Sequence, residues 1–376
     1  MSTYLPFDTQ VEIIKRVFRV KSLIRFRSVS KQWKSLIDSS KFISHHNVNQ
    51  PHPHHILVRY KCKPYNVASE YRYVSIVDDD SFPQHKFSPS VTSIVNQLND
   101  DSFILCSSHG LVCLYGYSRD RKNMIVVWNP TIRKSVGIEL PYKPDAVGFG
   151  VCPKTSDPKI VTITFLCDVD TVKWIGMVST LGCGGWRSVS LDLPKSLKFK
   201  RSEAVVDGVI YWVASNDMSQ DMIISFDLTS EEFGKVDVSD SLLHPRIQLS
   251  VFKHKDPESL VLVSYDDRAL DCDAWMMIKS EGPKYLCTKL FSHKFWSIDG
   301  TAGIMGFREN GEPIRQRLYM PDDDDVEDDL YTSLEAYEPS TQHIKDLGFE
   351  EGYYSFMMAS YTETLFLLNH SESIIQ

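Results

Sequence analysis

Residues 5–37 read LPFDTQVEIIKRVFRVKSLIRFRSVSKQWKSLI, and their apolar side chains recur at the three- to four-residue spacing of amphipathic helices. This pattern predicts three short helices, which carry in turn Val11, Ile14 and Val17, then Leu23, Phe26 and Val29, and then Trp33, Leu36 and Ile37. Fewer than about forty residues cannot bury a self-sufficient core. We therefore expect these helices either to present an apolar docking surface to another protein or to cap the larger body of the chain.

The helical stretch is basic, whereas the rest of the chain is acidic. Residues 1–44 contain nine Lys and Arg and three Asp and Glu, a balance of +6, so the remainder of a chain with net charge −8 carries −14. A basic module of this kind can be steered toward an acidic partner. Nucleic acid is the competing partner for a basic surface, but the acidic bulk of the chain and the lack of a nucleic-acid-binding motif argue against it.

The same residues resemble an F-box, the segment that docks a protein onto the Skp-type adaptor of a cullin–RING ubiquitin ligase. The matching pieces are, in order, Leu5-Pro6, Glu12-Ile13-Ile14, Val20-Lys21-Ser22-Leu23, Phe26-Arg27-Ser28-Val29-Ser30-Lys31 and Trp33-Lys34-Ser35-Leu36-Ile37. The resemblance implies that the adaptor contacts are made by Leu5, Pro6, Ile14, Leu23 and Val29, with support from Trp33. Plant members usually read R-L-P-V-K-S-L between the first two helices, whereas residues 16–20 here contain an extra residue and no proline. We therefore expect a looser or differently angled junction around Val17-Phe18-Arg19.

Residues 45–55 read HHNVNQPHPHH, a polar stretch that is broken by Pro51 and Pro53. We interpret it as a solvated linker between a helical domain at 1–44 and the body of the chain at 56–376. His52, His54 and His55 are candidate metal ligands. No Cys or acidic residue is spaced with them, so the linker interpretation is favoured over a metal site.

From Ile56 onward the pattern changes to short apolar or alternating runs, separated by turn residues such as Asn129-Pro130, Asp207-Gly208 and Asn310-Gly311. A strand, a polar turn and a second strand recur with starts near residues 126, 176, 223, 276 and 333. Spacings of about fifty residues are typical of kelch-type propeller blades. We therefore predict a β-propeller of about six blades. A β-sandwich or an open β-solenoid accounts less well for the spacing.

This region also resembles the plant F-box-associated propeller domain of type 1, which often accompanies kelch-like F-box proteins. The matching phrases are Ser108-His109-Gly110-Leu111-Val112-Cys113-Leu114, Val127-Trp128-Asn129-Pro130-Thr131-Ile132-Arg133-Lys134, Gly148-Phe149-Gly150-Val151, Trp186-Arg187-Ser188-Val189, Asp207-Gly208-Val209-Ile210-Tyr211-Trp212 and Ile224-Ser225-Phe226-Asp227. The expected fold class is thus multidomain, α followed by all-β, with a small N-terminal three-helix F-box and a target-binding propeller. We expect residues 371–376 to form a short frayed end.

No motif for catalysis or cofactor binding is present in the sequence, which lacks a G-x-S-x-G elbow, an H-E-x-x-H helix, a Walker-A loop and a dinucleotide-binding glycine pattern. We therefore expect a non-catalytic protein without a cofactor or metal. The eight cysteines include no C-x-x-C pair and are expected to be free thiols. The acidic runs at 78–80 and 322–329 are interpreted as solvated loops. With no membrane-spanning run and no visible secretory signal, we expect a cytoplasmic or nuclear protein.

The resemblance implies a substrate-recognition subunit of a Skp–cullin–F-box (SCF) ubiquitin ligase. Its helices would bind the Skp-type adaptor, and through it the cullin and RING subunits, while its propeller would hold a target protein for ubiquitination and degradation. Two other functions stay open, namely an F-box scaffold that acts outside ubiquitination and a propeller that binds a ligand or sugar. The loops 116–124, 214–221 and 264–273 are candidates for contact with the target.

Overall fold

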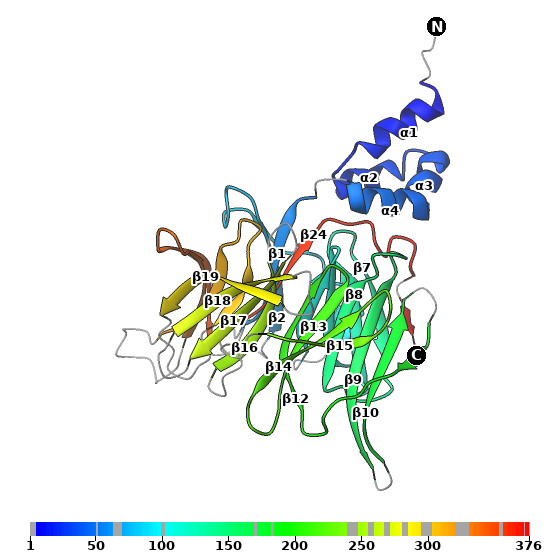
Figure 1. Cartoon of the computed structure of the whole chain (residues 1–376). Helices are drawn as coiled ribbons and strands as arrows, with labels where there is room; N and C mark the ends of the chain where they lie inside the picture. Colours follow the sequence, from blue (N-terminus) through cyan, green and yellow to red (C-terminus); the bar gives the residue numbers. More distant parts are fainter. Residues whose placement is uncertain are drawn as a thin grey trace.

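A computed structural model shows four helices followed by a β-propeller (Figure 1). The structure describes residues 5–49, 52–62, 70–98, 102–168, 171–181, 184–238, 247–254, 259–266, 271–279, 285–294, 303–319, 331–352, 356–371 and 373–375. The helices gather on one face of the propeller, above the segment that follows β24 (Figure 1). The predicted class, a small helical module before a six-bladed propeller, is confirmed.

The helical module, residues 5–49, contains α1 (Phe7–Lys15), α2 (Val20–Phe26), α3 (Lys31–Ile37) and α4 (Ser40–Asn49). Ser30 caps α3, because its hydroxyl accepts a hydrogen bond from the Trp33 N–H at 3.1 Å. Three helices were expected, and α4 is the additional one, covering the first residues of the expected linker. The sequence of α4, SKFISHHNVN, shows no clear apolar stripe, because one of the residues that the helix buries beside Phe42 is the polar His46.

The propeller consists of six sheets, each a blade described here from its innermost strand outward. Blade 1 contains β24 (Met357–Thr362), β1 (His54–Cys62), β2 (Glu70–Val77) and β3 (Lys86–Phe87). Blade 2 contains β4 (Phe103–Ser108), β5 (Leu111–Tyr117), β6 (Asn123–Asn129), β7 (Lys134–Glu139) and β25 (Ser373–Ile375), and a short 3-10 helix, η1 (Val95–Gln97), precedes it. Blade 3 contains β8 (Ala146–Val151), β9 (Pro158–Asp168), β10 (Thr171–Thr180) and β11 (Trp186–Val189).

The remaining three blades follow the same plan. Blade 4 contains β12 (Lys198–Val206), β13 (Val209–Ser215), β14 (Asp221–Asp227) and β15 (Phe233–Val236). Blade 5 contains β16 (Ile247–His254), β17 (Ser259–Asp266), β18 (Asp271–Lys279) and β19 (Tyr285–Lys294). Blade 6 contains β20 (Ile304–Phe307), β21 (Pro313–Tyr319), β22 (Tyr331–Glu338) and β23 (His343–Gly352). The repeats near residues 126, 176, 223, 276 and 333 fall in β6, β10, β14, β18 and β22, the third strand of successive blades.

The ring closes because a strand from late in the chain completes the first blade. β24 pairs antiparallel with β1, with Ile56 opposite Ser360, and so becomes the innermost strand of blade 1. Neighbouring inner strands contact one another around the ring, and β20 of blade 6 meets β24. Blades are also joined by buried aromatic residues, as where the indole of Trp212 donates a hydrogen bond to the Val147 carbonyl at 2.9 Å.

Residues 363–371, called here the C-terminal segment, lead from β24 to β25 under the helical module. Two residues of the motif at 127–134 hold this segment in place. The Asn129 side-chain amide donates to the carbonyls of Thr364 and Phe366 at 3.0 and 2.8 Å. The Lys134 ammonium donates to the carbonyls of Leu368 and His370 at 2.9 and 2.6 Å. The motif therefore serves to anchor the far end of the chain.

A second motif makes room for the same part of the chain. Gly110, in the turn between β4 and β5, has φ +79°, and a Cβ placed on it would collide with the Thr362 carbonyl and the Thr364 side chain. Beyond the C-terminal segment, β25 pairs in parallel with β7, with Ser373 opposite Val136. Within the end that we expected to fray, residues 373–375 thus form a fifth strand of blade 2, and this pairing covers the outer edge of that blade.

Candidate functional site

The helical module exposes five large apolar side chains, a set that we call the apolar surface. Their exposed fractions are 53% for Leu5, 41% for Phe7, 52% for Ile13, 43% for Phe18 and 63% for Val29. They lie at the start of α1, along α1, and in the turns on either side of α2. In Figure 1, α1 extends away from the propeller. Several exposed large apolar residues on so small a module are typical of a protein-binding surface.

Ile14 and Leu23 are buried in the module, so the structure corrects their placement on its surface. They belong to a cluster whose other buried members are Val20, Ile37, Phe42, Leu365 and Leu368. Leu365 and Leu368 come from the C-terminal segment, so the module is packed directly onto the propeller chain. Periodicity identified the apolar residues but could not tell which of them this chain covers itself.

Trp33 and Pro6 lie where they can support the apolar surface. Trp33 is half-buried, and its indole N–H donates to Gln10 Oε1 at 2.8 Å. Its ring also packs edge-on against Phe26, with centroids 5.5 Å apart. These contacts fasten α3 to both α1 and α2. Pro6 is exposed and occupies the N-cap position of α1, next to the exposed Leu5.

The junction between α1 and α2 is tied to the propeller by Glu363. The Val20 N–H donates to Glu363 Oε2 at 3.1 Å, and nitrogens of Arg19 and His55 each lie 3.9 Å from Oε1. Burial by itself would raise the pKa of Glu363, but His55 and the Val20 N–H outweigh it and lower that pKa below its ordinary value. Sequence analysis missed Glu363 because nothing in its local sequence relates it to a helix at the other end of the chain.

We expected a solvated linker between the helical module and the propeller, but this polar stretch is packed. The contact region between the two modules, which includes His46, His52, Glu363, Leu365 and Leu368, is called the seam here. His46 of α4 is buried, and its Nε2 lies 3.0 Å from the Val17 carbonyl. His52 Nε2 lies 3.0 Å from the His46 carbonyl, and the two rings are 4.9 Å apart. Burial lowers the pKa of His46 to about 4, with a further contribution from His52, and burial also lowers the pKa of His52. β1 begins at His54, so His54 and His55 belong to blade 1.

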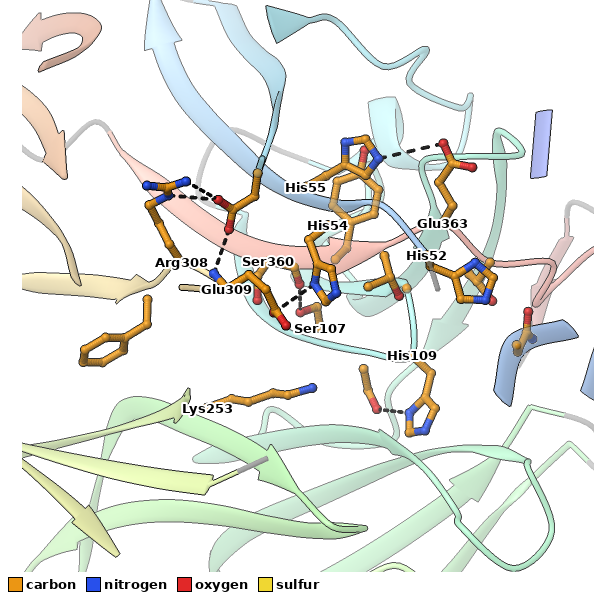
Figure 2. Close-up of a pocket in the computed structure, with 18 of the residues that line it drawn as sticks. His52, His54, His55, Ser107, His109, Lys253, Arg308, Glu309, Ser360 and Glu363 are labelled. Carbon is orange, nitrogen blue, oxygen red and sulfur yellow. Dashed lines mark hydrogen bonds and ion pairs between the residues drawn. The ribbon is translucent and has the colours of Figure 1, made fainter. Parts of the chain in front are cut away.

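A cavity of about 580 Å³ opens on the face of the propeller next to the helical module (Figure 2). It adjoins a second cavity of about 290 Å³ in the central channel, and the two share Ser107, Lys253, Phe307 and Ser360. Successive strands of a blade run in opposite directions, so the loops 116–124 and 214–221 lie on the other face of the propeller. Of the loop 264–273, the described residues 264–266 and 271–273 lie at the corresponding ends of β17 and β18, and residues 267–270 are outside the described ranges. Sequence analysis therefore did not identify this cavity.

The charged and metal-ligating candidates take part in other contacts. Within the described ranges, no group of three or more His, Cys, Asp and Glu residues could hold a metal ion. His54 Nδ1 lies 3.1 Å from Glu309, and Asp78, expected in a solvated loop, lies 2.8 Å from Arg308 with both side chains almost fully buried. The acidic run 322–329 lies outside the described residues.

Six described cysteines are free. No helix in the described part of the chain is long and apolar enough to span a membrane.

These features define a two-module protein, in which a small helical unit with exposed apolar side chains is fastened to a six-bladed propeller. Comparison with known proteins agrees with this class. A family model for the F-box domain matches residues 3–45, and a model for the F-box associated beta propeller domain matches residues 66–276. The chain belongs to the F-box associated beta propeller family. The matching propeller model is the one designated FBA_3, whereas the motifs suggested type 1 of the same family.

Individual relatives are also F-box proteins. Putative F-box protein At3g10430 of Arabidopsis thaliana is 27% identical over 249 residues, which cover 63% of this chain and 62% of that protein. F-box/kelch-repeat protein At3g23880, also of Arabidopsis thaliana, is 26% identical over 333 residues, 81% of this chain and 85% of that protein. Among solved structures, the fucose-specific lectin from Aleuria aurantia has a TM-score of 0.42 and 9% identity over 80% of this chain and 91% of that chain. The match thus spans about three fifths of the first relative's length.

Proposed function

We propose that this protein is the substrate-recognition subunit of an SCF-type ubiquitin ligase. Its helical module would bind a Skp-type adaptor, and through it cullin and RING subunits, while its propeller holds a target protein. The observation that carries the proposal is the apolar surface: the module has already buried Ile14 and Leu23 against its own chain and still exposes five large apolar side chains. Covering such side chains is favourable by roughly 25 cal/mol per Å². The F-box match over residues 3–45 supports this use of the surface.

In this function the protein is not an enzyme, and its contribution is positional. A target held by the propeller and a conjugating enzyme brought by the ligase would be kept within one assembly, which raises the effective concentration of a target lysine. Glu363, Leu365 and Leu368 contact the helical module and hold it in place on the propeller. These contacts make the link between the adaptor-binding and target-binding modules stiffer. The proposal includes a cytoplasmic or nuclear location, which imaging of a fluorescent fusion tests.

Point substitutions on the apolar surface provide a direct test. Deleting residues 1–44 would uncover Leu365 and Leu368, so loss of binding after that deletion could reflect damage to the propeller. We expect Val29→Glu and Ile13→Glu each to weaken capture of a purified Skp-type adaptor by about tenfold or more, because a charge would then be buried in the interface. Met218→Glu, at a residue that is 73% exposed in the turn between β13 and β14, is the matched control and should bind normally.

The control for folding is the thermal transition, which all three variants should share with the wild type. Full adaptor binding by both Val29→Glu and Ile13→Glu would refute docking through this surface. A target that co-purifies with the wild-type chain should accumulate in cells when the proteasome is inhibited. If the adaptor binds but target turnover does not depend on the proteasome, the protein acts instead as a scaffold outside degradation.

A further inference from the structure

The cavity of about 580 Å³, which we call the mouth, opens beside the seam. Its lining includes Asn47 of α4, His55 of β1 and Glu363 of the C-terminal segment, so a molecule bound there would contact both the helical module and the propeller. A cavity of this volume is within the usual size of a small-molecule site. Serine and threonine hydroxyls add further polar groups to its wall, from Ser107, Ser108, Ser360, Thr362 and Thr364.

The charged side chains of the mouth already have partners within the chain. The three carboxylates each face a base, and two of these pairs are drawn in Figure 2: Asp78 lies 2.8 Å from Arg308, Glu309 lies 3.1 Å from His54, and Glu363 lies 3.9 Å from His55. Three further bases also have contacts of their own within the chain, namely Lys253, His109 and His254. A charged ligand of either sign would have to compete with these contacts. The mouth therefore favours a neutral ligand that binds through hydrogen bonds.

The side of the mouth next to the seam has polar atoms that await such hydrogen bonds. Three residues there carry a buried nitrogen without a hydrogen-bond partner in the described part of the chain: Asn47 Nδ2, His52 Nδ1 and His55 Nδ1. His55 is itself only 5% exposed. Buried polar groups are nearly always hydrogen-bonded, so these nitrogens indicate partners from outside the protein chain.

The hydrogen bonds within the protein decide which of these nitrogens donate and which accept. Asn47 Oδ1 accepts from the Leu365 N–H at 3.1 Å, which fixes the orientation of the amide and leaves Nδ2 as a donor. His52 Nε2 lies 3.0 Å from the His46 carbonyl, which can only accept, so Nε2 carries the hydrogen. Burial lowers the pKa of His52 and so favours the neutral ring, in which Nδ1 is an acceptor. The ligand must therefore accept from Asn47 and donate to His52.

We propose that the mouth binds a neutral molecule with several hydroxyl groups, namely a sugar. A hydroxyl both donates and accepts, so the hydroxyls of one sugar ring can serve Asn47 and His52 together. A carboxylate cannot donate a hydrogen bond and an ammonium cannot accept one, so neither group serves both residues. Two sources offer this chemistry, a free sugar and a sugar attached to a target protein. Only the second source rests on the proposed function, since it would make the mouth a target-binding site.

Ligand-detected NMR titration of the full-length protein with matched sugars tests the proposal. The probes are glucose, galactose and mannose, each with its uronate and its 2-amino counterpart, which keep the ring and add a negative or a positive charge. We expect at least one neutral sugar to bind, and its two charged counterparts to bind at least about tenfold more weakly. The methyl glycoside of that sugar then separates the sources. If it binds as well as the free sugar, the site accepts an attached sugar; if only the free sugar binds, the ligand is a free sugar.

Two substitutions and a control locate the binding to the mouth. Asn47→Asp keeps the oxygen that accepts from Leu365 but loses the donor, so it should weaken sugar binding by about tenfold. Ser360→Phe should prevent binding, because the larger side chain occupies part of the mouth. Asn216→Asp makes the same chemical change in the loop 214–221 on the other face of the propeller, where the Asn216 oxygen also accepts backbone N–H groups, and should bind like the wild type.

Thermal transitions show whether each variant is folded. The proposal is overturned if no neutral sugar binds, if neutral and charged sugars bind equally, or if folded Asn47→Asp and Ser360→Phe variants bind normally. Val29→Glu, which alters the apolar surface of the helical module, should bind the sugar like the wild type. Its sugar binding and its adaptor capture are measured separately, which keeps failure here distinct from failure of the proposed function.

Discussion

Glu363 accepts a hydrogen bond from the Val20 N–H at 3.1 Å, which ties the C-terminal segment, at the residue directly after the closing strand β24, to the first residue of α2. An N–H in the first turn of a helix has no partner within that helix, and a negative charge is favoured there. Val20 also belongs to the junction that departs from the usual plant pattern. The contact therefore joins three features that are far apart in the sequence: the unusual junction, the closing strand and the seam between the modules.

Replacing Glu363 should loosen the seam without unfolding the propeller. We expect Glu363→Ala to leave the Val20 N–H without its partner and to destabilise the module's attachment by about 1–3 kcal/mol. Amide hydrogen exchange of α2 and α4 should then become faster, while exchange in β8 and β12 stays unchanged. Glu363→Gln keeps an acceptor oxygen and should have a smaller effect. Glu232→Ala, at an exposed acidic residue of blade 4, serves as the control. Unchanged exchange of α2 in Glu363→Ala would contradict this role.

The histidines of the seam make the protein less stable in acid. The pKa of His46 is about 4 in the folded protein, below its ordinary value near 6.5, so the unfolded chain binds a proton in this interval and the folded chain does not. His52 and Glu363 face His46, and their pKa values are also lowered, so their contributions to stability are likewise lost as the pH falls. From about pH 7 to about pH 5, His46 alone should cost about 2 kcal/mol of unfolding free energy.

Urea titrations at the two pH values measure this loss. His46→Gln can still donate a hydrogen bond toward the Val17 carbonyl but cannot be protonated, so it should reduce the pH dependence of stability. His343→Gln, at an exposed histidine on the outer strand β23, is the matched control and should keep the wild-type dependence. If the wild type and His46→Gln lose the same stability between the two pH values, burial of His46 is not the cause.

Local patterns were sufficient for the fold, because each blade repeats the same short-range signals. The repeat starts all fell on the third strand of a blade, and the turn at Asp207-Gly208 joins β12 to β13 as expected. The closing of the ring by β24 could not be predicted in the same way, because no pattern in the sequences of β24 and β1 indicates that these two distant strands pair. The same limit applies to α4, where a buried His46 takes the place of an apolar residue.

The candidate site was predicted only in part, for a related reason. Leu5 and Val29 are exposed as expected, whereas Ile14 and Leu23 are covered by Leu365 and Leu368 from the other end of the chain. Periodicity shows that a face is apolar, but burial depends on which distant segment reaches that face. The cavity was missed for the same reason, since its lining is drawn from blades 1, 2, 5 and 6 and from α4.

Asp78 provides the last prediction, because an acidic residue expected in solvent forms a buried ion pair between the first and last blades. Arg308 Nη2 lies 2.8 Å from Asp78 Oδ1, and the side chains are only 5% and 4% exposed. Arg308 also contacts Glu312 at 2.5 Å and lies over the Phe82 ring, and the Glu309 N–H donates to Asp78 Oδ2 at 2.8 Å.

Asp78→Asn should destabilise the protein by about 3 kcal/mol, because it removes one charge of a buried pair. In the exposed pair of Lys122 and Glu139, Glu139→Gln should cost less than about 1 kcal/mol. Urea titrations compare the two variants, and equal losses would mean that burial does not strengthen the link between the blades.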